Sequence, residues 1–128
     1  FYEAIKNGEY TYFVREDTEL PMMYMADAVR GLIGIADAPR DQLEYPCSYN
    51  IGALSFTAGE LTAAIQEHMP EFEATYEPDE RQDIADSWPD TVDDSGARED
   101  WGWDHEYDLD AMVEDMLDNL AGKLTSQH

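Results

Sequence analysis

Tyr2 and Lys6 form a YxxxK pair, the spacing at which a lysine ammonium can help a tyrosine phenolate to take the proton of an alcohol. The chain of 128 residues holds eight tyrosines and two lysines, so one such pair arises readily by chance. Its sequence contains neither a GxGxxG nor a GxxxxGK[ST] loop that would hold nucleotide phosphates. We therefore expect no catalytic dyad and no dinucleotide binding by this chain alone, and we assign Tyr2 and Lys6 to a packing helix.

The residues that commonly bind metals lack the spacing of a metal site. His68, His105 and His128 lie far apart, and neither HExxH nor CxxC occurs. The segment Asp90–Gly96 is rich in acidic residues, but these miss the alternating ligand positions of a calcium loop. We expect no metal ligands, and we expect His68 to interact with the negative end of a helix.

Three tryptophans stand in the polar stretch Arg81–Trp103. Trp101 and Trp103 flank a glycine just before the last predicted helix, and we expect them to pack that helix onto the domain. Trp88 lies between a serine and a proline in a predicted loop, where a large ring with one N–H donor could close over a small polar ligand. Burial of Trp88 in the core is the alternative.

The net charge of −23 comes from 30 acidic and 7 basic residues. Phosphate-mediated nucleic-acid binding and association with an anionic membrane both need basic clusters, so we exclude both. Acidic residues are spread from Glu3 to Asp118 without a block of five, which is typical of a solvated surface adapted to high salt. A nucleic-acid mimic or a docking face for a basic partner would instead concentrate the charge on one side.

The length and composition predict one globular domain over residues 1–128. Hydrophobic residues make up 43% of the chain, enough for a core, and no apolar run approaches the ~20 residues of a membrane span. Cys47 is the single cysteine, so no intrachain disulfide can form. Without a recognisable leader segment, we expect a cytoplasmic protein.

Strands and helices are predicted to alternate, which favours an α/β fold. The expected strands are Tyr10–Val14, Met22–Met25, Ser48–Gly52 and Glu73–Tyr76. The expected helices are Phe1–Lys6, Asp27–Ala36, Thr57–Met69, Asp79–Ala85, a turn from Asp94 to Trp101, and Leu109–Leu124 after the cap Asp108.

Two helices carry further local signals. Thr57 and Glu60 are spaced as a capping box, and an expected buried stripe follows, made of Leu61, Ala64, Ile65 and Met69. In the helix Asp27–Ala36, apolar side chains including Val29 and Ile33 share one face.

Four segments together resemble one known family. They are PMMYMADAVRG from Pro21, SYNIGALSFTAGEL from Ser48, RQDIADSWP from Arg81 and DDSGAREDWGW from Asp93. In this order they resemble the C-terminal, substrate-binding portion of the NAD-dependent L-threonine 3-dehydrogenases of the extended short-chain dehydrogenase/reductase superfamily.

The resemblance implies a small α/β substrate-binding subdomain that lacks the N-terminal Rossmann domain. The catalytic tyrosine, lysine and serine or threonine, and the NAD loop, would lie in that missing part, so the resemblance places no catalytic or cofactor-binding residue here. It implies that Trp88, and less directly Arg81 and Met22, form a wall and lid over L-threonine in the intact enzyme. It also implies an inactive fragment of an enzyme that we expect to be a homo-oligomer.

Two alternatives remain. Nucleotide-sugar epimerases and dehydratases share the looser outline, but they carry an arginine for the diphosphate where this chain has Leu20, and a second arginine near Arg81–Asp83. The loss of at least one such clamp, at a net charge of −23, favours a small substrate over a sugar nucleotide. The other alternative is a free-standing acidic interaction module.

Overall fold

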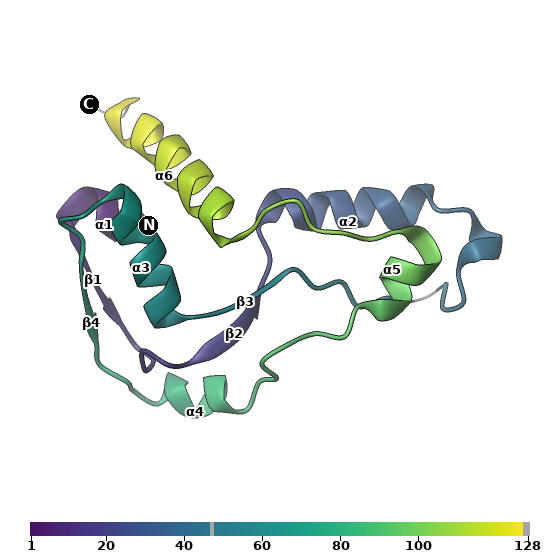
Figure 1. The fold of residues 1–128 in the computed structure, drawn as a ribbon, viewed down its shortest axis with the longest axis horizontal. Coiled ribbons are helices and arrows are strands. Elements are labelled where there is room, and N and C mark those ends of the chain that lie inside the picture. Colours follow the sequence, from purple (N-terminus) through teal and green to yellow (C-terminus); the bar gives the residue numbers. More distant parts are fainter. Residues whose placement is uncertain (47, 127–128) are drawn as a thin grey trace.

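The computed structural model describes residues 1–46 and 48–126, so Cys47 and His128 lie outside the described part. Helices and strands alternate as expected for an α/β fold, and the molecule is elongated (Figure 1). The strands are β1 (Glu9–Tyr12), β2 (Glu19–Met22), β3 (Leu54–Thr57) and β4 (Glu73–Tyr76). The helices are α1 (Tyr2–Asn7), α2 (Met25–Asp37), α3 (Ala58–His68), α4 (Arg81–Asp86), α5 (Ser95–Trp101) and α6 (Leu109–Ser126), with a short 3-10 turn η1 (Arg40–Gln42).

The strands form two separate two-stranded sheets. β1 pairs with β4 in parallel, with Tyr12 opposite Tyr76. β2 pairs with β3 antiparallel, with Leu20 opposite Phe56. Because β3 leads directly into α3, this second sheet connects the helical end of the molecule to the arm that contains α2 (Figure 1).

The main core lies where α1, α3 and α6 meet. It is built from Ala4, Ala64, Ile65, Phe72, Val113 and Leu117. The capping box that begins α3 is confirmed, since Thr57 Oγ1 accepts from the Glu60 N–H at 3.1 Å and Glu60 Oε2 accepts from the Thr57 N–H at 2.8 Å. Asp108 caps α6 as predicted by accepting from the Ala111 N–H at 2.8 Å.

Two predicted strands were wrong in position or type. The strand expected at Met22–Met25 ends at Met22, because its pairing with β3 starts at Glu19 and α2 already begins at Met25. Ser48–Gly52 is not a strand, and it has no neighbouring strand in the described part of the chain. Side chains hold it instead, because Trp103 Nε1 donates to Gly52 O at 2.8 Å.

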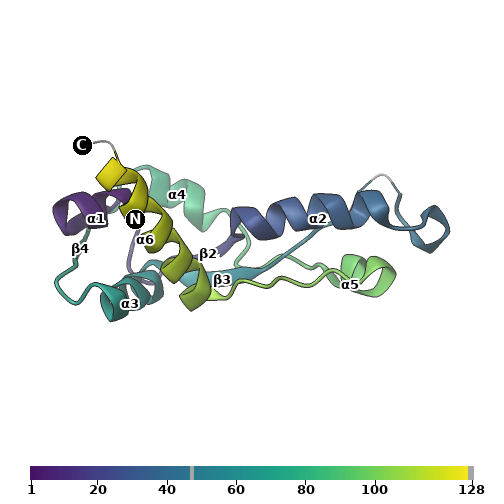
Figure 2. The ribbon, with the colours of Figure 1, turned by 90° about the horizontal axis from the view of Figure 1, so that it is seen from above.

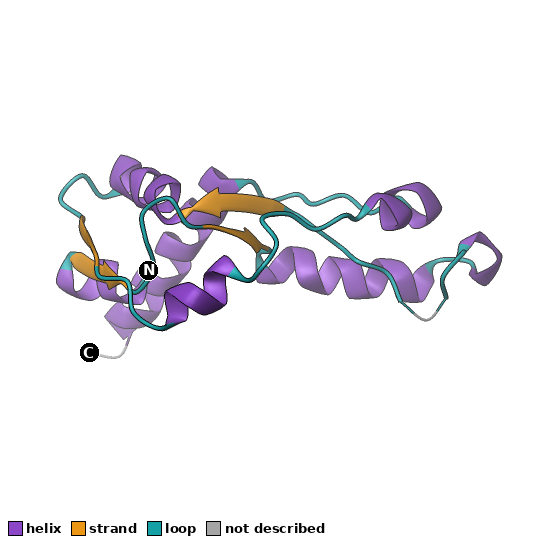
Figure 3. Ribbon diagram, turned by 90° about the horizontal axis from the view of Figure 1, so that it is seen from below, coloured by secondary structure: helices purple, strands orange, loops and turns teal. Residues whose placement is uncertain are grey.

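The arm consists of α2 and α5, which run beside each other at one end of the molecule (Figures 2 and 3). The expectation that Trp101 and Trp103 pack the last helix was wrong, because both rings lie against α2. A Cβ at Gly34 would lie 2.8 Å from Trp101 Cζ3, and one at Gly31 would lie 3.3 Å from Trp103 Cζ3. Glycines in α2 therefore let the indole rings approach the helix backbone.

The opposite face of α2 is exposed. It presents Met25 and Leu32, which are 72% and 69% exposed, together with Val29 and Ile33. Val29 and Ile33 thus share a face as predicted, and they are 46% and 56% exposed.

Candidate functional site

Met22 lies at the end of β2, where the second sheet approaches the aromatic residues of β1. Its side chain is 42% exposed and lines a cavity of about 280 Å³ together with Leu20, Phe56 and Phe13. Alternation along β2 explains this placement, since Leu20 and Met22 point to the same side of the strand. The predicted substrate-side residue Met22 therefore lies at the mouth of an apolar cavity.

Arg81 begins α4, and its guanidinium lies over the ring of Phe13, 3.7 Å from the ring centroid. Arg81 Nε donates to both carboxylate oxygens of Asp79 at 3.0 Å. These hydrogen bonds lower the pKa of the Asp79 carboxyl. The charge of Arg81 is thus already compensated, although its stacking on Phe13 places it beside the cavity that Met22 lines.

Trp88 follows α4 in a loop, and its ring is 55% exposed, so it is not a core residue. It lines a separate polar pocket of about 210 Å³ together with Arg15, Thr18 and Asp86. Thr18 lines the apolar cavity as well, so the two hollows share a wall. The structure therefore places Met22 in the wall of one hollow and Trp88 in the wall of its neighbour, while Arg81 contacts the first hollow only through Phe13.

Gln82 positions α4, and with it the loop of Trp88, although its role has no signature in the sequence. Its side chain is buried, and Oε1 accepts from the Arg15 N–H at 2.7 Å and from Thr18 Oγ1 at 3.2 Å. Its Nε2 donates to Asp86 Oδ1 at 2.7 Å. A buried amide bonded on both sides fixes α4 against the turn between β1 and β2. The contact spans 64 residues, so no local pattern indicated it.

Asp27 fixes the corner between β2 and α2. Its carboxylate is 0% exposed and accepts from Arg30 Nη1 at 2.8 Å and from the backbone N–H groups of Glu106 and Tyr107 at 3.0 and 3.1 Å. A buried carboxylate is stable only with such partners. Asp27 thereby binds the segment that precedes α6 to the start of α2, which begins three residues after Met22 in the sequence.

Tyr24 ties the same corner to α6, because its hydroxyl donates to the Asp115 carboxylate. This hydrogen bond, with a smaller contribution from burial, raises the pKa of Tyr24 to about 12. The phenol therefore keeps its proton at neutral pH, which suits a structural donor and not a proton acceptor.

Asp94 and Asp93 hold the start of α5. Asp94 Oδ2 accepts from the Gly52 N–H at 3.2 Å and from Arg98 Nε at 2.9 Å. Burial raises the pKa of Asp94, but these donors outweigh burial and leave its pKa below the ordinary value. Asp94 directly precedes α5, at the start of the predicted turn, and its neighbour Asp93 accepts from the Ser95 N–H at 3.1 Å.

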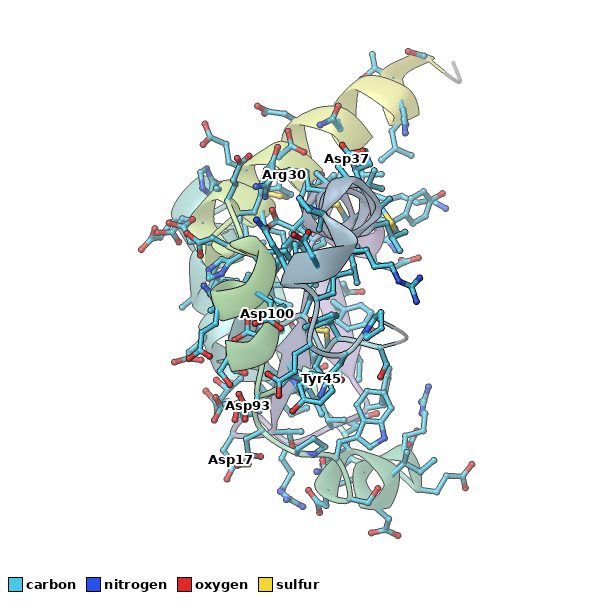
Figure 4. The ribbon with its side chains drawn as sticks, turned by 90° about the vertical axis from the view of Figure 1, so that its right-hand side faces the viewer. Asp17, Arg30, Asp37, Tyr45, Asp93 and Asp100 are labelled. Carbon is cyan, nitrogen blue, oxygen red and sulfur yellow. The ribbon has the colours of Figure 1, made fainter. Side chains whose placement is uncertain are left out.

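Acidic side chains occur on several elements of the structure. Figure 4 labels Asp17, Asp37, Asp93 and Asp100, which stand on different parts of the chain. Within residues 1–46 and 48–126, no three histidine, cysteine or acidic side chains are grouped closely enough to hold a metal ion. Across the same residues, no helix is both long and apolar enough to cross a membrane.

The fold and the sequence together match one part of the extended short-chain dehydrogenase/reductases. The L-threonine dehydrogenase of Phytophthora infestans has a segment that is 53% identical, with a TM-score of 0.93. That match covers 96% of this chain and 40% of the solved chain. No family model matches the chain.

Among proteins of this class, the chain is homologous to a segment of the L-threonine 3-dehydrogenases. The bovine mitochondrial L-threonine 3-dehydrogenase is 48% identical over 118 residues, 91% of this chain and 31% of that enzyme. An uncharacterized epimerase/dehydratase of Staphylococcus haemolyticus is 43% identical over 96% of this chain and 39% of that protein. The chain thus spans only a third to two fifths of the length of these relatives.

Proposed function

We propose that the chain forms the substrate-side part of an NAD-dependent L-threonine 3-dehydrogenase. Such an enzyme oxidises the 3-hydroxyl of L-threonine to a ketone, giving 2-amino-3-oxobutyrate, and passes hydride to NAD. The observation that carries the proposal is the 53% identity to the Phytophthora infestans enzyme at a TM-score of 0.93, over nearly the whole chain. The chemical groups of the reaction would lie in the remaining part of such an enzyme.

The residues of this chain do not fit NAD. A dinucleotide site needs glycines at the N-terminus of a helix, where backbone N–H groups and the helix dipole attract phosphate. In the described residues the two glycines with positive φ, Gly8 and Gly102, end α1 and α5, while Gly59 and Gly96 stand singly in the first turns of α3 and α5 and form no glycine-rich loop. NAD would therefore be bound by the other part of the enzyme.

Trp88 and Met22 would form the substrate-facing surface. Trp88 has an exposed ring on a loop that follows a firmly held helix, which suits a lid that excludes water around the transferred hydride. Met22 would contribute an apolar wall. Arg81 would act through its contact with Phe13 and not as a free cation, because Asp79 already binds its guanidinium.

The same contacts favour a small substrate over a nucleotide sugar. Leu20 faces the apolar cavity where the sugar-nucleotide enzymes place an arginine, and Arg81 is paired with Asp79. A diphosphate would find no free guanidinium at either position. The substrate would accordingly be an amino acid and not a sugar diphosphate.

The exposed face of α2 fits a part of a larger protein better than a free-standing acidic module. Met25, Val29, Leu32 and Ile33 form an exposed apolar helix face. We propose that the nucleotide-binding part of the enzyme covers this face.

A chimera tests the proposal. The segment of the Phytophthora infestans enzyme that matches this chain is replaced by this chain, and NADH formation is followed with L-threonine as substrate. We expect turnover that depends on L-threonine, and a Trp88→Ala chimera with kcat/KM lower by about tenfold or more. Glu114→Ala, at an exposed position of α6 that lines neither hollow, serves as the control variant.

Two results would contradict the proposal. One is a folded chimera that binds NAD but oxidises no L-threonine, in particular one that binds a uridine diphosphate sugar instead. The other is NADH formation by the isolated chain, which would place catalytic groups in these 128 residues.

A further inference from the structure

The segment 87–89, which contains Trp88, begins next to a firmly bound carboxylate. Asp86 accepts from Arg15 Nη2 at 3.0 and 3.3 Å and from Gln82 Nε2 at 2.7 Å. Arg15 lies in the turn between β1 and β2, while Gln82 is a buried residue of α4. The residue directly before the segment is therefore held by two different elements.

The other end of the segment is held by the second sheet. Ser55 in β3 donates from Oγ to the carbonyl oxygen of Asp90 at 2.6 Å. Between the two ends, the Trp88 N–H donates to the Ala85 carbonyl oxygen at 3.1 Å. The ring of Pro89 fixes its own φ and restricts the backbone of the preceding residue, which is Trp88. The backbone of Trp88 thus has little conformational freedom.

The ring of Trp88, in contrast, is not packed. It is 55% exposed, whereas Trp103 is 4% exposed and its ring lies 5.9 Å from that of Trp101 between centroids. An exposed side chain changes rotamer within picoseconds to nanoseconds. Such a rotation changes how far the ring covers the polar pocket that Trp88 lines together with Asp86 and Asp90. The structure therefore combines a fixed backbone with a free ring.

We propose that Ser55 and Asp86 are positioning residues, and that Trp88 closes over L-threonine by rotation of its ring on a fixed backbone. This rests on the proposed dehydrogenase function. A loop that becomes ordered on closure loses conformational entropy at each of its residues, whereas a ring on a fixed backbone loses only the freedom of its side-chain torsions. Ser55 thereby favours substrate binding without contacting the substrate.

The first test is ¹⁵N relaxation of the purified chain, which requires no turnover. We expect an order parameter of about 0.85 for the backbone amide of Trp88 and one below about 0.6 for its indole N–H. Ser55→Ala removes one hydroxyl and is expected to lower the order parameters of the Trp88 and Asp90 amides. Thr75→Val is the matched control, because it removes a strand hydroxyl that is bonded to Thr11 Oγ1 at 2.8 Å in the other sheet. It is expected to leave both amides unchanged.

The second test uses the chimera with the Phytophthora infestans enzyme. Ser55→Ala is expected to raise the KM for L-threonine by about twofold to fivefold and to leave the KM for NAD unchanged. Ser55→Thr keeps a hydroxyl and is expected to restore the KM for L-threonine. Asp86→Ala releases the other end of the segment and is expected to act in the same direction as Ser55→Ala. Thr75→Val should leave both KM values unchanged.

Three results would overturn the positioning role. The Trp88 amide could be as mobile as its indole N–H, Ser55→Ala could leave both amides unchanged, or it could raise both KM values equally, as a general loss of structure would. A folded chimera that binds NAD but oxidises no L-threonine would instead contradict the proposed function, and the relaxation of the isolated chain would still show whether Ser55 holds the segment.

Discussion

Gly34→Ala tests whether α2 is held by close contact with an indole ring. Replacing an exposed glycine inside a helix by alanine stabilises a protein by about 1 kcal/mol, because alanine loses less backbone entropy. At Gly34 the added methyl carbon would lie 2.8 Å from Trp101 Cζ3 and 3.3 Å from Cε3. Such a ring cannot bend away, and overpacking of this kind costs about 1 to 3 kcal/mol. We expect a net loss of about 1 kcal/mol.

Gly122→Ala is the matched control, because Gly122 lies in α6 and a Cβ there would meet nothing within 4 Å. We expect this variant to gain up to about 1 kcal/mol, so the two substitutions should differ by about 2 kcal/mol with opposite signs. The free energy of unfolding is measured by urea denaturation with a common m value.

A double-mutant cycle identifies the cause. Trp101→Leu removes the ring, and in that background Gly34→Ala should become as favourable as Gly122→Ala. The reasoning is refuted if Gly34→Ala alone stabilises the chain as much as Gly122→Ala does. It is also refuted if the loss persists after the ring has been removed.

Three further predictions concern charge. Asp27→Asn replaces one acceptor oxygen by an amide that cannot accept from Arg30 or the backbone, and it should lower the free energy of unfolding in urea by about 3 kcal/mol. Asp118→Asn, at an exposed position of α6, should change it little. The pKa of Asp94 is lowered in the folded chain, so this carboxylate contributes fully to stability above its unfolded pKa of about 4, and the contribution is lost as pH falls through the folded pKa. Asp94→Asn should therefore make the melting temperature fall less steeply as the pH is lowered from about 6 to about 3. If the acidic surface is adapted to salt, the melting temperature should rise from low to molar salt, and an unchanged value would contradict that adaptation.

Local signals in the sequence predicted most of the helices and part of the strands. The capping box at Thr57 and the apolar spacing of α6 depend on residues only a few positions apart. The helices that they predict could therefore be found without knowledge of the tertiary structure. The glycine after Asn7 likewise ends α1 with a φ of 74°.

Features that depend on distant partners were not predictable in this way. Ser48–Gly52 has the composition of a strand, but a strand also needs a neighbour, and none of the described residues supplies one. Trp101 and Trp103 were assigned to the wrong helix because sequence proximity to α6 says nothing about the glycines of α2. At the candidate site, Trp88, Arg81 and Met22 were chosen from the resemblance, and their roles stay predictions.

Because one face of α2 is exposed and apolar, the salt concentration should decide whether copies of this chain repel or associate. At low ionic strength, copies that each carry a charge of −23 repel one another, and the repulsion keeps their apolar faces apart. At molar salt the range of that repulsion falls to about 3 Å, while burial of Met25 and Leu32 against a second copy stays favourable. Salt that screens the acidic surface should therefore also drive the copies together, and sedimentation at rising salt should show an increasing average mass that an acidic protein without an exposed apolar face lacks.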